Sequence, residues 1–218
     1  DVLGLKRVIN SYGLSEACVV SMTRREDGPD VIASTTGRVL PGVELKLLNE
    51  RGVPVLAGEE GEIHVAGIGV MRGYWKNEAL TSESIVDGWF QTGDIGTIDG
   101  EGNLSIVGRK SEMFICGGFN VYPSEVENLL LHMGGISAVA VVSVPDTRHG
   151  EVGIAFVVPS AGETLKAGDI LDWSRRNIAN YKAPRHVYVR DILPTNNNGK
   201  VIKADLRDEA LGDMQAGF

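Results

Sequence analysis

The pattern of apolar residues changes near residue 108, and this change limits the folds that the chain can adopt. Between residues 37 and 107, brief apolar runs alternate with turns rich in Gly, Asn and Asp, a spacing that is typical of short antiparallel strands. After residue 108, helical and strand patterns are mixed. The sequence therefore predicts an α+β protein in which an antiparallel, barrel-like β subdomain, residues 1–109, is followed by a small α+β domain, residues 110–218.

The second part of the chain gives the clearest signals for individual elements. Pro123 favours the first position of a helix, apolar residues follow at helical spacing up to Met133, and Gly134–Gly135 ends the pattern. The elements expected after it are, in order, a strand (136–144), a strand (152–160), a helix (170–178), a strand (185–194) and a short amphipathic tail. In the first part we expect one helix, around residues 77–85, and a strand at Arg7–Ile9.

Composition and charge exclude several classes of protein. Lys and Arg number 21 against 29 Asp and Glu, a formal net charge of -8, so the broad cationic surface of a nucleic-acid-binding protein is not expected. Cys18 and Cys116 have no metal-ligand spacing, which favours a cytoplasmic protein without a disulfide framework or zinc site. The longest apolar run is too short for a transmembrane segment. Because the chain starts at Asp1, we expect a piece of a longer protein.

The motif "YGLSE", residues 12–16, combines groups that suit a nucleotide. Tyr12 offers an aromatic face for a base, Gly13 permits close approach of a phosphate, and the oxygens of Ser15 and Glu16 suit a phosphate and Mg²⁺. Taken alone, the motif is better explained as the end of a strand with Ser15 as a helix cap. It therefore indicates a nucleotide only in combination with other motifs.

The motif "QTGD", residues 91–94, places a carboxylate after a tight turn. The two acceptor oxygens of Asp94 match the two hydroxyls of a ribose, although Gly-Asp is equally common in hairpin turns. Two other glycine-containing segments do not fit phosphate loops, because "GIGVMRG" (67–73) has the wrong spacing and "PTNNNGK" (194–200) has Pro194 in place of the first Gly. No G-x-S-x-G motif is found, which argues against a serine hydrolase.

Together and in this order, the motifs resemble those of the adenylate-forming acyl-CoA synthetases, the family shared with peptide-synthetase adenylation domains and luciferases. The resemblance covers nearly the whole chain and rests on "YGLSE" (12–16), "GEIHVAGIGVMRGYW" (61–75), "WFQTGD" (89–94), "GRKSEMFICGGFNVYPSEVE" (108–127) and "LPTNNNGK" (193–200). The fourth segment is most similar to ligases for fatty-acyl, steroid side-chain and aromatic acids. The resemblance implies that residues 1–109 are the C-terminal part of a large AMP-binding domain and that residues 110–218 are a mobile lid.

Enzymes of this family join a carboxylic acid to AMP with release of pyrophosphate, and the thiol of CoA then displaces AMP. The resemblance thus implies ATP, Mg²⁺ and CoA as ligands. Tyr12 would stack on adenine, with Gly13 beside it, and Ser15 would lie by the α-phosphate. Glu16 would hold Mg²⁺, and Asp94 would bind the ribose hydroxyls. Arg109 would contact ribose or phosphate.

The same resemblance assigns roles in the second part of the chain. Lys200 matches the catalytic lysine, whose ammonium group neutralises charge as the carboxylate attacks the α-phosphate. Gly117 and Gly118 would let the backbone approach the pantetheine arm of CoA. Ser111 stands at the hinge position, where the family usually has Asp or Lys, and Lys110 precedes it by one residue.

The sequence leaves two alternatives open. The chain could belong to an adenylation domain that loads a carrier protein, although no carrier motif follows the lysine motif, which favours free CoA. It could also be a folded fragment without activity, because the Ser/Thr/Gly-rich loop that holds the ATP phosphates in this family has no match. The acid and the oligomeric state are not specified by the sequence.

Overall fold

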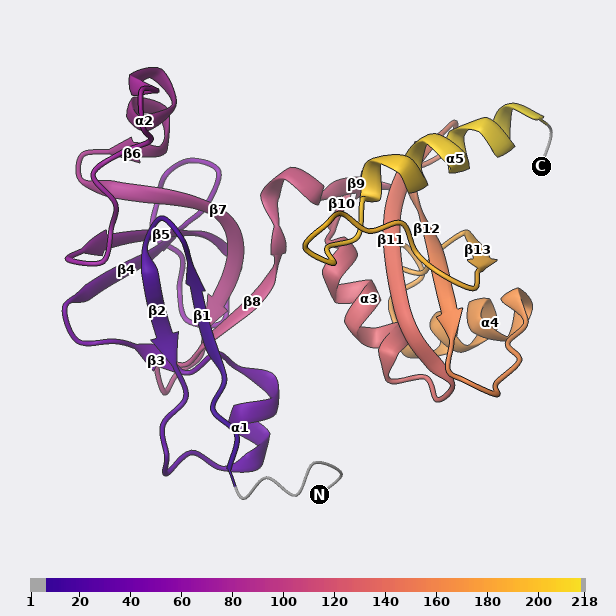
Figure 1. Cartoon of the computed structure of the whole chain (residues 1–218), viewed down its shortest axis with the longest axis horizontal. Helices are drawn as coiled ribbons and strands as arrows, with labels where there is room; N and C mark the ends of the chain where they lie inside the picture. The colour runs from indigo at the N-terminus through magenta and orange to yellow at the C-terminus, as the bar shows by residue number, and fades with distance from the viewer. Residues whose placement is uncertain (1–6, 217–218) are drawn as a thin grey trace. The chain divides into compact units, whose positions relative to one another are not determined.

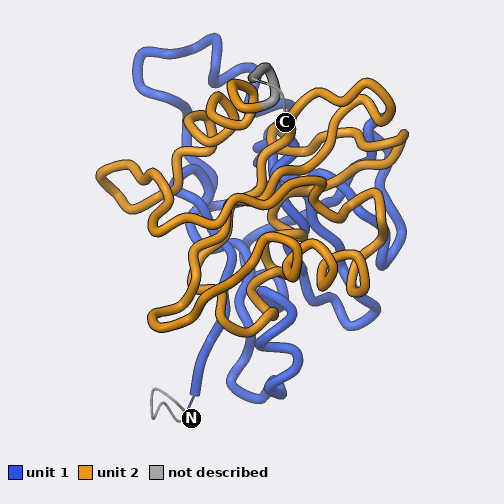
Figure 2. Tube along the Cα trace, turned by 90° about the vertical axis from the view of Figure 1, so that its right-hand side faces the viewer, with its two compact units in different colours: residues 1–110 blue, residues 111–218 orange. Residues whose placement is uncertain are grey.

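The computed structural model describes residues 7–216 and divides the chain into two compact units, unit 1 up to Lys110 and unit 2 from Ser111 (Figures 1 and 2). Unit 1 contains most of the short strands, and unit 2 combines one mixed sheet with three helices. Within the described range, no helix has the length and apolar character to cross a bilayer. The α+β class expected from the sequence is confirmed.

Unit 1 consists of two antiparallel sheets and two short helices. Its elements are β1 Ser11–Leu14, β2 Cys18–Met22, α1 Pro29–Ser34, β3 Arg38–Val39, β4 Val43–Leu48, β5 Gly61–Gly67, α2 Glu78–Ser84, β6 Ile85–Val86, β7 Trp89–Ile98 and β8 Leu104–Arg109. One sheet has the order β1-β2-β3; the other has the order β4-β5-β7-β6, with β8 also paired to β7. The described strands therefore form two open sheets, and the expected barrel does not close, because the edge strands β4 and β8 pair with β5 and β7 and not with each other.

The core of unit 1 lies between these sheets. Alternate residues of β5, Ile63 and Val65, point inward with Phe90 of β7, and Val20 of β2 belongs to the same buried cluster. This alternation follows from the period of two along a strand. Burying side chains of this size contributes about 1.5–3 kcal/mol each, so the cluster fixes the strands that carry the polar residues of unit 1.

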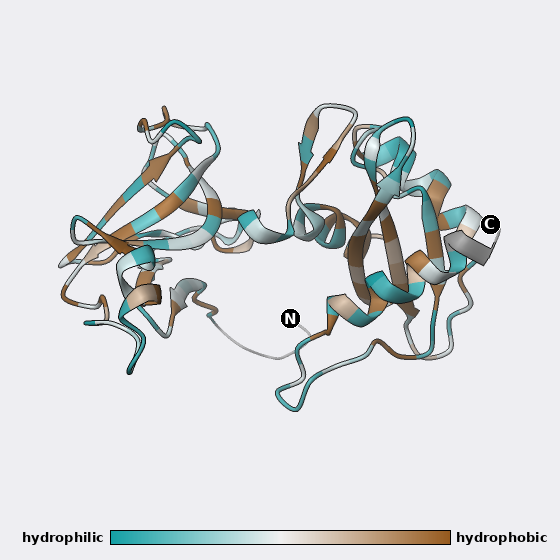
Figure 3. Ribbon diagram, turned by 90° about the horizontal axis from the view of Figure 1, so that it is seen from above, coloured by the Kyte–Doolittle hydropathy of each residue, from teal (hydrophilic) through white to brown (hydrophobic). Residues whose placement is uncertain are grey.

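Unit 2 is built around a mixed sheet of five strands. Its elements are η1 Lys110–Glu112 (which begins in unit 1), β9 Phe114–Cys116, β10 Phe119–Val121, α3 Pro123–Leu131, β11 Ile136–Asp146, β12 Gly150–Pro159, α4 Ala167–Asn177, β13 His186–Val189 and α5 Lys203–Ala216. The order is β10-β9-β12-β11, and β13 pairs with β12 in parallel. Residues 152–157 of β12 are all buried, so this apolar strand is covered on both faces; strands of this sheet are largely brown, the hydrophobic colour, in Figure 3.

Most of the expected elements are present. The helices predicted around 77–85, from Pro123 and through 170–178 correspond to α2, α3 and α4, and the two long apolar runs form the β11–β12 hairpin. The strand predicted at Arg7–Ile9 is wrong, since β1 starts only at Ser11. Val8 and Ile9 are each 56 % exposed, so the apolar run has no buried face that would fix it in a sheet.

Gly117 and Gly118 form the two-residue turn of the β9–β10 hairpin. Cys116 pairs with Phe119 across this turn, and the two glycines have φ values of +59° and +87°. Two positive φ values are the requirement of a type I′ turn, which Gly-Gly meets without strain. The glycine pair inside the apolar run is therefore explained by the hairpin itself, whether or not a ligand approaches it.

We expect Gly117→Ala to destabilise the chain by about 1–2 kcal/mol, because an L-residue in the left-handed region brings Cβ close to the next carbonyl. Gly134→Ala is the matched control, since Gly134 does not have a positive φ and a Cβ there would meet no atom within 4 Å. Urea unfolding followed by circular dichroism measures both. Equal midpoints for the two variants would contradict this explanation of the turn.

Candidate functional site

The centre of the candidate site in unit 1 is the carboxylate of Asp94, which is only 4 % exposed. Its Oδ2 accepts a hydrogen bond of 2.5 Å from the Tyr12 hydroxyl. Its Oδ1 lies 2.8 Å from Nε of Arg109 in an ion pair. The backbone N–H of Asp94 donates to Oγ1 of Thr92 at 3.1 Å. The buried charge is thus paired and hydrogen-bonded, as a buried carboxylate requires.

The strand pairing explains why these side chains meet. Asp94 on β7 is the direct partner of Arg109 on β8, so the two side chains are cross-strand neighbours. The Thr92 hydroxyl also donates to the backbone oxygen of Ile63 on β5 at 2.8 Å. Tyr12 comes from β1 in the other sheet. The hydrogen bond between Tyr12 and Asp94 therefore joins the two sheets of unit 1.

The environment keeps the Tyr12 phenol protonated. Burial raises its pKa first, and the hydrogen bond to Asp94 raises it further, while Thr92 and the Arg109 charge lower it by smaller amounts. A phenol with a raised pKa remains a hydrogen-bond donor at neutral pH. Tyr12 can therefore hold the Asp94 carboxylate throughout the physiological range.

The turn after β1 places Glu16 beside Tyr74. The Tyr74 hydroxyl donates to Glu16 Oε1 at 3.2 Å, and the backbone oxygen of Glu16 accepts from the Met71 N–H at 2.7 Å. Ser15 in the same turn is exposed. A Cβ on Gly13 would lie 2.4 Å from the backbone oxygen of Cys18, so the close pairing of β1 and β2 already requires glycine there.

In unit 2, Lys200 lies on a loop that one asparagine organises. Oδ1 of Asn196 accepts from the backbone N–H groups of Asn198 and Lys200 at 3.0 and 2.9 Å, and the Asn196 N–H donates to the Lys200 oxygen at 2.8 Å. Gly199 supplies a φ of +78° between them. The backbone is ordered by these bonds, and the Lys200 side chain is exposed.

The structure brings together only some of the residues that the sequence singled out. Tyr12, Asp94 and Arg109 are in contact, and Glu16 follows Tyr12 closely in the chain. Ser111, in η1, Gly117 and Gly118, at the hairpin tip, and Lys200 belong to unit 2, where all four are exposed. The partners that the sequence analysis missed are Thr92 and Tyr74, although each lies inside a quoted motif.

We expect Tyr12→Phe to lower the free energy of unfolding by about 1–3 kcal/mol, because it removes a donor from a buried carboxylate. The difference from the unchanged chain should be full below pH 10, the ordinary pKa of a free phenol, and should shrink as pH rises above it, because the unfolded chain then loses the phenol proton that the folded chain, with its raised pKa, retains.

Urea unfolding at pH 8 and at pH 11 tests this expectation. Tyr181→Phe, which removes the hydroxyl of a half-buried tyrosine in unit 2, is the control. A Tyr12→Phe variant as stable as the control at pH 8 would show that the bond to Asp94 contributes little.

Comparison with known proteins places these residues in a family. The family model described as AMP-binding enzyme matches residues 1–75, and the one described as AMP-binding enzyme C-terminal domain matches residues 125–200. The chain belongs to the AMP-binding enzyme family. Tyr12 and Glu16 lie inside the first match, and Lys200 is the last residue of the second.

Several curated relatives of this family member are named as CoA ligases or CoA synthases. One is 3-[(3aS,4S,7aS)-7a-methyl-1,5-dioxo-octahydro-1H-inden-4-yl]propanoyl:CoA ligase of Rhodococcus jostii, 44% identical over 208 residues, which are 95% of this chain and 38% of the relative. Another is feruloyl-CoA synthase of an Amycolatopsis species, 42% identical over 200 residues, 91% of this chain and 40% of the relative. The chain thus spans about two fifths of their length.

Solved structures of the family have the same fold over this region. ATP-bound MatB from Rhodopseudomonas palustris is 35% identical with a TM-score of 0.84, over 93% of this chain and 40% of that chain. The o-succinylbenzoate CoA synthetase MenE from Bacillus subtilis, in complex with its acyl-adenylate intermediate, is 33% identical with a TM-score of 0.85, over 92% of this chain and 41% of that chain.

Proposed function

We propose that the protein containing this chain activates a carboxylic acid with ATP to an acyl-AMP, releases pyrophosphate, and transfers the acyl group to CoA. The observation that carries the proposal is the buried Asp94 carboxylate with Tyr12 and Arg109 around it, in a chain whose relatives include several CoA ligases. Residues 1–109 would be part of the AMP-binding domain and residues 110–218 its mobile lid.

The contacts of Asp94 are compatible with a ribose. Each carboxylate oxygen has two lone-pair sites; in the structure Oδ2 accepts a hydrogen bond from Tyr12, and Oδ1 is ion-paired with Arg109. Each oxygen can therefore also accept one ribose hydroxyl. The bond from its hydroxyl fixes the Tyr12 ring, whose face would stack on adenine. Arg109 lies 2.8 Å from Asp94 through Nε, and its guanidinium carries further N–H donors for ribose or phosphate.

Glu16 suits a role in binding Mg²⁺ together with the substrate. Among residues 7–216 no group of three or more His, Cys, Asp or Glu side chains could hold a metal. Mg²⁺ is commonly bound by one or two carboxylates and by substrate phosphates. Glu16, oriented by Tyr74, fits this arrangement. The ion would neutralise charge on the ATP phosphates.

Lys200 would act in the first half-reaction. A carboxylate oxygen of the acid attacks the α-phosphorus, and the bond to the bridging oxygen of pyrophosphate breaks. Negative charge accumulates around the α-phosphate, where the Lys200 ammonium would neutralise it. In the second half-reaction the CoA sulfur attacks the acyl carbon and AMP leaves, a step that requires no cation bridging the carboxylate and the phosphate.

We expect Lys200→Ala in the complete protein to reduce pyrophosphate release about 10²- to 10³-fold, the usual effect of removing one preorganised donor. Thioester formation from supplied acyl-AMP should be largely spared. Stopped-flow assays of the two steps measure this split. Lys166→Ala, another lid lysine, is the control. Equal loss of both steps would contradict the role, and no effect would make Lys200 a solvent-facing turn residue.

Two alternatives give different results in simple assays. A carrier-loading domain would transfer the acyl group to a phosphopantetheine arm on a carrier protein and leave free CoA unacylated. An inactive fragment would show no ATP binding by isothermal titration of residues 1–218.

A panel of carboxylic acids, supplied with ATP and CoA to the complete protein, identifies the substrate. A cytoplasmic location, with Cys18 and Cys116 as the free thiols seen here, is part of the same proposal.

A further inference from the structure

The three-residue turn η1, Lys110–Glu112, crosses the boundary between the two units. Ser111 is its middle residue and is exposed. The two residues that flank Ser111 both form ion pairs, but their partners belong to different units. Lys110 is tied within unit 1, and Glu112 is tied within unit 2.

The tie in unit 1 joins Lys110 to the central part of a sheet. Its Nζ lies 2.7 Å from Oε2 of Glu62, on β5. The Glu62 side chain is mostly buried, at 14 % exposure, whereas that of Lys110 is 56 % exposed. Ion pairs with one well-exposed partner are weak and are screened by salt. This tie is therefore the weaker of the two.

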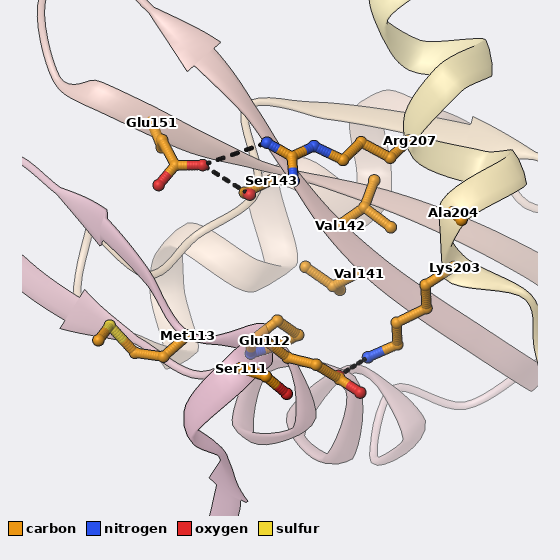
Figure 4. Close-up of a pocket in the computed structure, with 11 residues that line it drawn as sticks. Ser111, Glu112, Met113, Val141, Val142, Ser143, Glu151, Lys203, Ala204 and Arg207 are labelled. Carbon is orange, nitrogen blue, oxygen red and sulfur yellow. Dashed lines mark hydrogen bonds and ion pairs between the residues drawn. The ribbon is translucent and has the colours of Figure 1, made fainter. Parts of the chain in front are cut away.

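The ion pairs in unit 2 join three elements through Lys203, whose contact with Glu112 is the dashed line between these two residues in Figure 4. Nζ of Lys203, the first residue of α5, lies 2.5 Å from Oε2 of Glu112 and 2.8 Å from Oε1 of Glu127 on α3. The same Glu127 oxygen accepts the backbone N–H of Val141 on β11 at 2.8 Å. All three side chains are at most 33 % exposed. Glu112 is thus held firmly to the core of unit 2.

We propose that Glu62 and Lys203 are positioning residues that confine the rotation between the units to the backbone bonds of Ser111. A single residue offers only two soft dihedrals, and the ion pairs of its two neighbours, the stronger one at Glu112, oppose spreading of the change along the chain. Hinges of a few residues absorb such changes in φ and ψ. The inference rests on the proposed function, because it is the alternation between half-reactions that requires such a rotation.

The unit 2 tie also has a consequence for Lys200. Lys203 follows Lys200 by three residues, so the side chain that holds Glu112 lies at the end of the catalytic loop. When unit 2 turns about Ser111, this link makes the Lys200 loop move with the residue next to the hinge. Without the Lys203–Glu112 ion pair, the Lys200 loop could shift relative to the hinge. The rate of the step that uses Lys200 would then fall, because reacting groups must be held in a close and fixed geometry.

The cavity beside the hinge provides a matched control. It has a volume of about 510 Å³ and is lined by Lys203 and by Arg207, one helical turn later on α5. Arg207 lies 3.7 Å from Glu151, a residue of β12 and not of η1. Arg207→Met and Lys203→Met each remove one positive charge from the same cavity. Only the second removes a link to the hinge.

Distance measurements between the units test the inference without activity. Spin labels on Cys18, exposed in unit 1, and on Asp172→Cys, exposed in unit 2, are measured by pulsed electron spin resonance in a Cys116→Ala chain. Lys203→Met and Glu112→Gln should broaden the distance distribution, and Lys203→Arg should restore it. Arg207→Met should leave it unchanged. Equal distributions for Lys203→Met, Arg207→Met and the parent would overturn the proposal.

Kinetics in the complete protein give the second readout. Because Lys200 acts in the first half-reaction, Lys203→Met should lower the rate of that step about threefold to tenfold relative to thioester formation from supplied acyl-AMP, with rescue by Lys203→Arg. An unchanged ratio of the two rates would contradict the positioning role. If the unmodified protein performs neither half-reaction, the proposed function fails, and the distance distributions alone then decide the inference. Glu112→Gln keeps the test valid if Lys203→Met does not fold.

Discussion

The buried carboxylate of Asp94 is the constraint on which unit 1 depends. A charge removed from water must be paired and hydrogen-bonded, and here a guanidinium from the adjacent strand and a phenol from the other sheet meet that need. The hydrogen bond from Tyr12 joins the two sheets of unit 1, and burial raises the pKa of its phenol, so the bond persists at neutral pH. The same group that fixes the sheets is the one that we propose for ribose binding.

The sequence predicted the fold of the second part best. Pro123 and the glycines after α3 are local signals, and the long apolar runs of β11 and β12 need no knowledge of their neighbours. The strand at Arg7–Ile9 was wrong because an apolar run forms a strand only where a partner covers it. Motif order identified Tyr12 and Asp94, but their direct contact joins residues 82 positions apart. No local pattern specifies such a pair or the supporting hydroxyl of Thr92.

The glycines at 117 and 118 show how one residue type can have two sufficient explanations. Their positive φ values follow from the I′ turn of a hairpin, and the resemblance assigns the same backbone to CoA. Gly13 is similar, since the neighbouring strand excludes a side chain there. In this member of the AMP-binding enzyme family Asp94 likewise has a structural role, because its bond from Tyr12 joins the sheets of unit 1, whereas packing does not explain the exposed side chain of Lys200. The chain passes from one unit to the other at Ser111, and each neighbour of Ser111 is ion-paired within its own unit.

The most direct test of the account compares ATP with 2′-deoxy-ATP in pyrophosphate release by the complete protein. If Asp94 binds the ribose hydroxyls, the unmodified protein should prefer ATP by about tenfold or more, the value of one hydrogen bond to a charged group. Asp94→Asn should lose most of that preference. The ratio of the two rates is insensitive to the amount of folded protein. The same preference in both proteins would contradict the central claim.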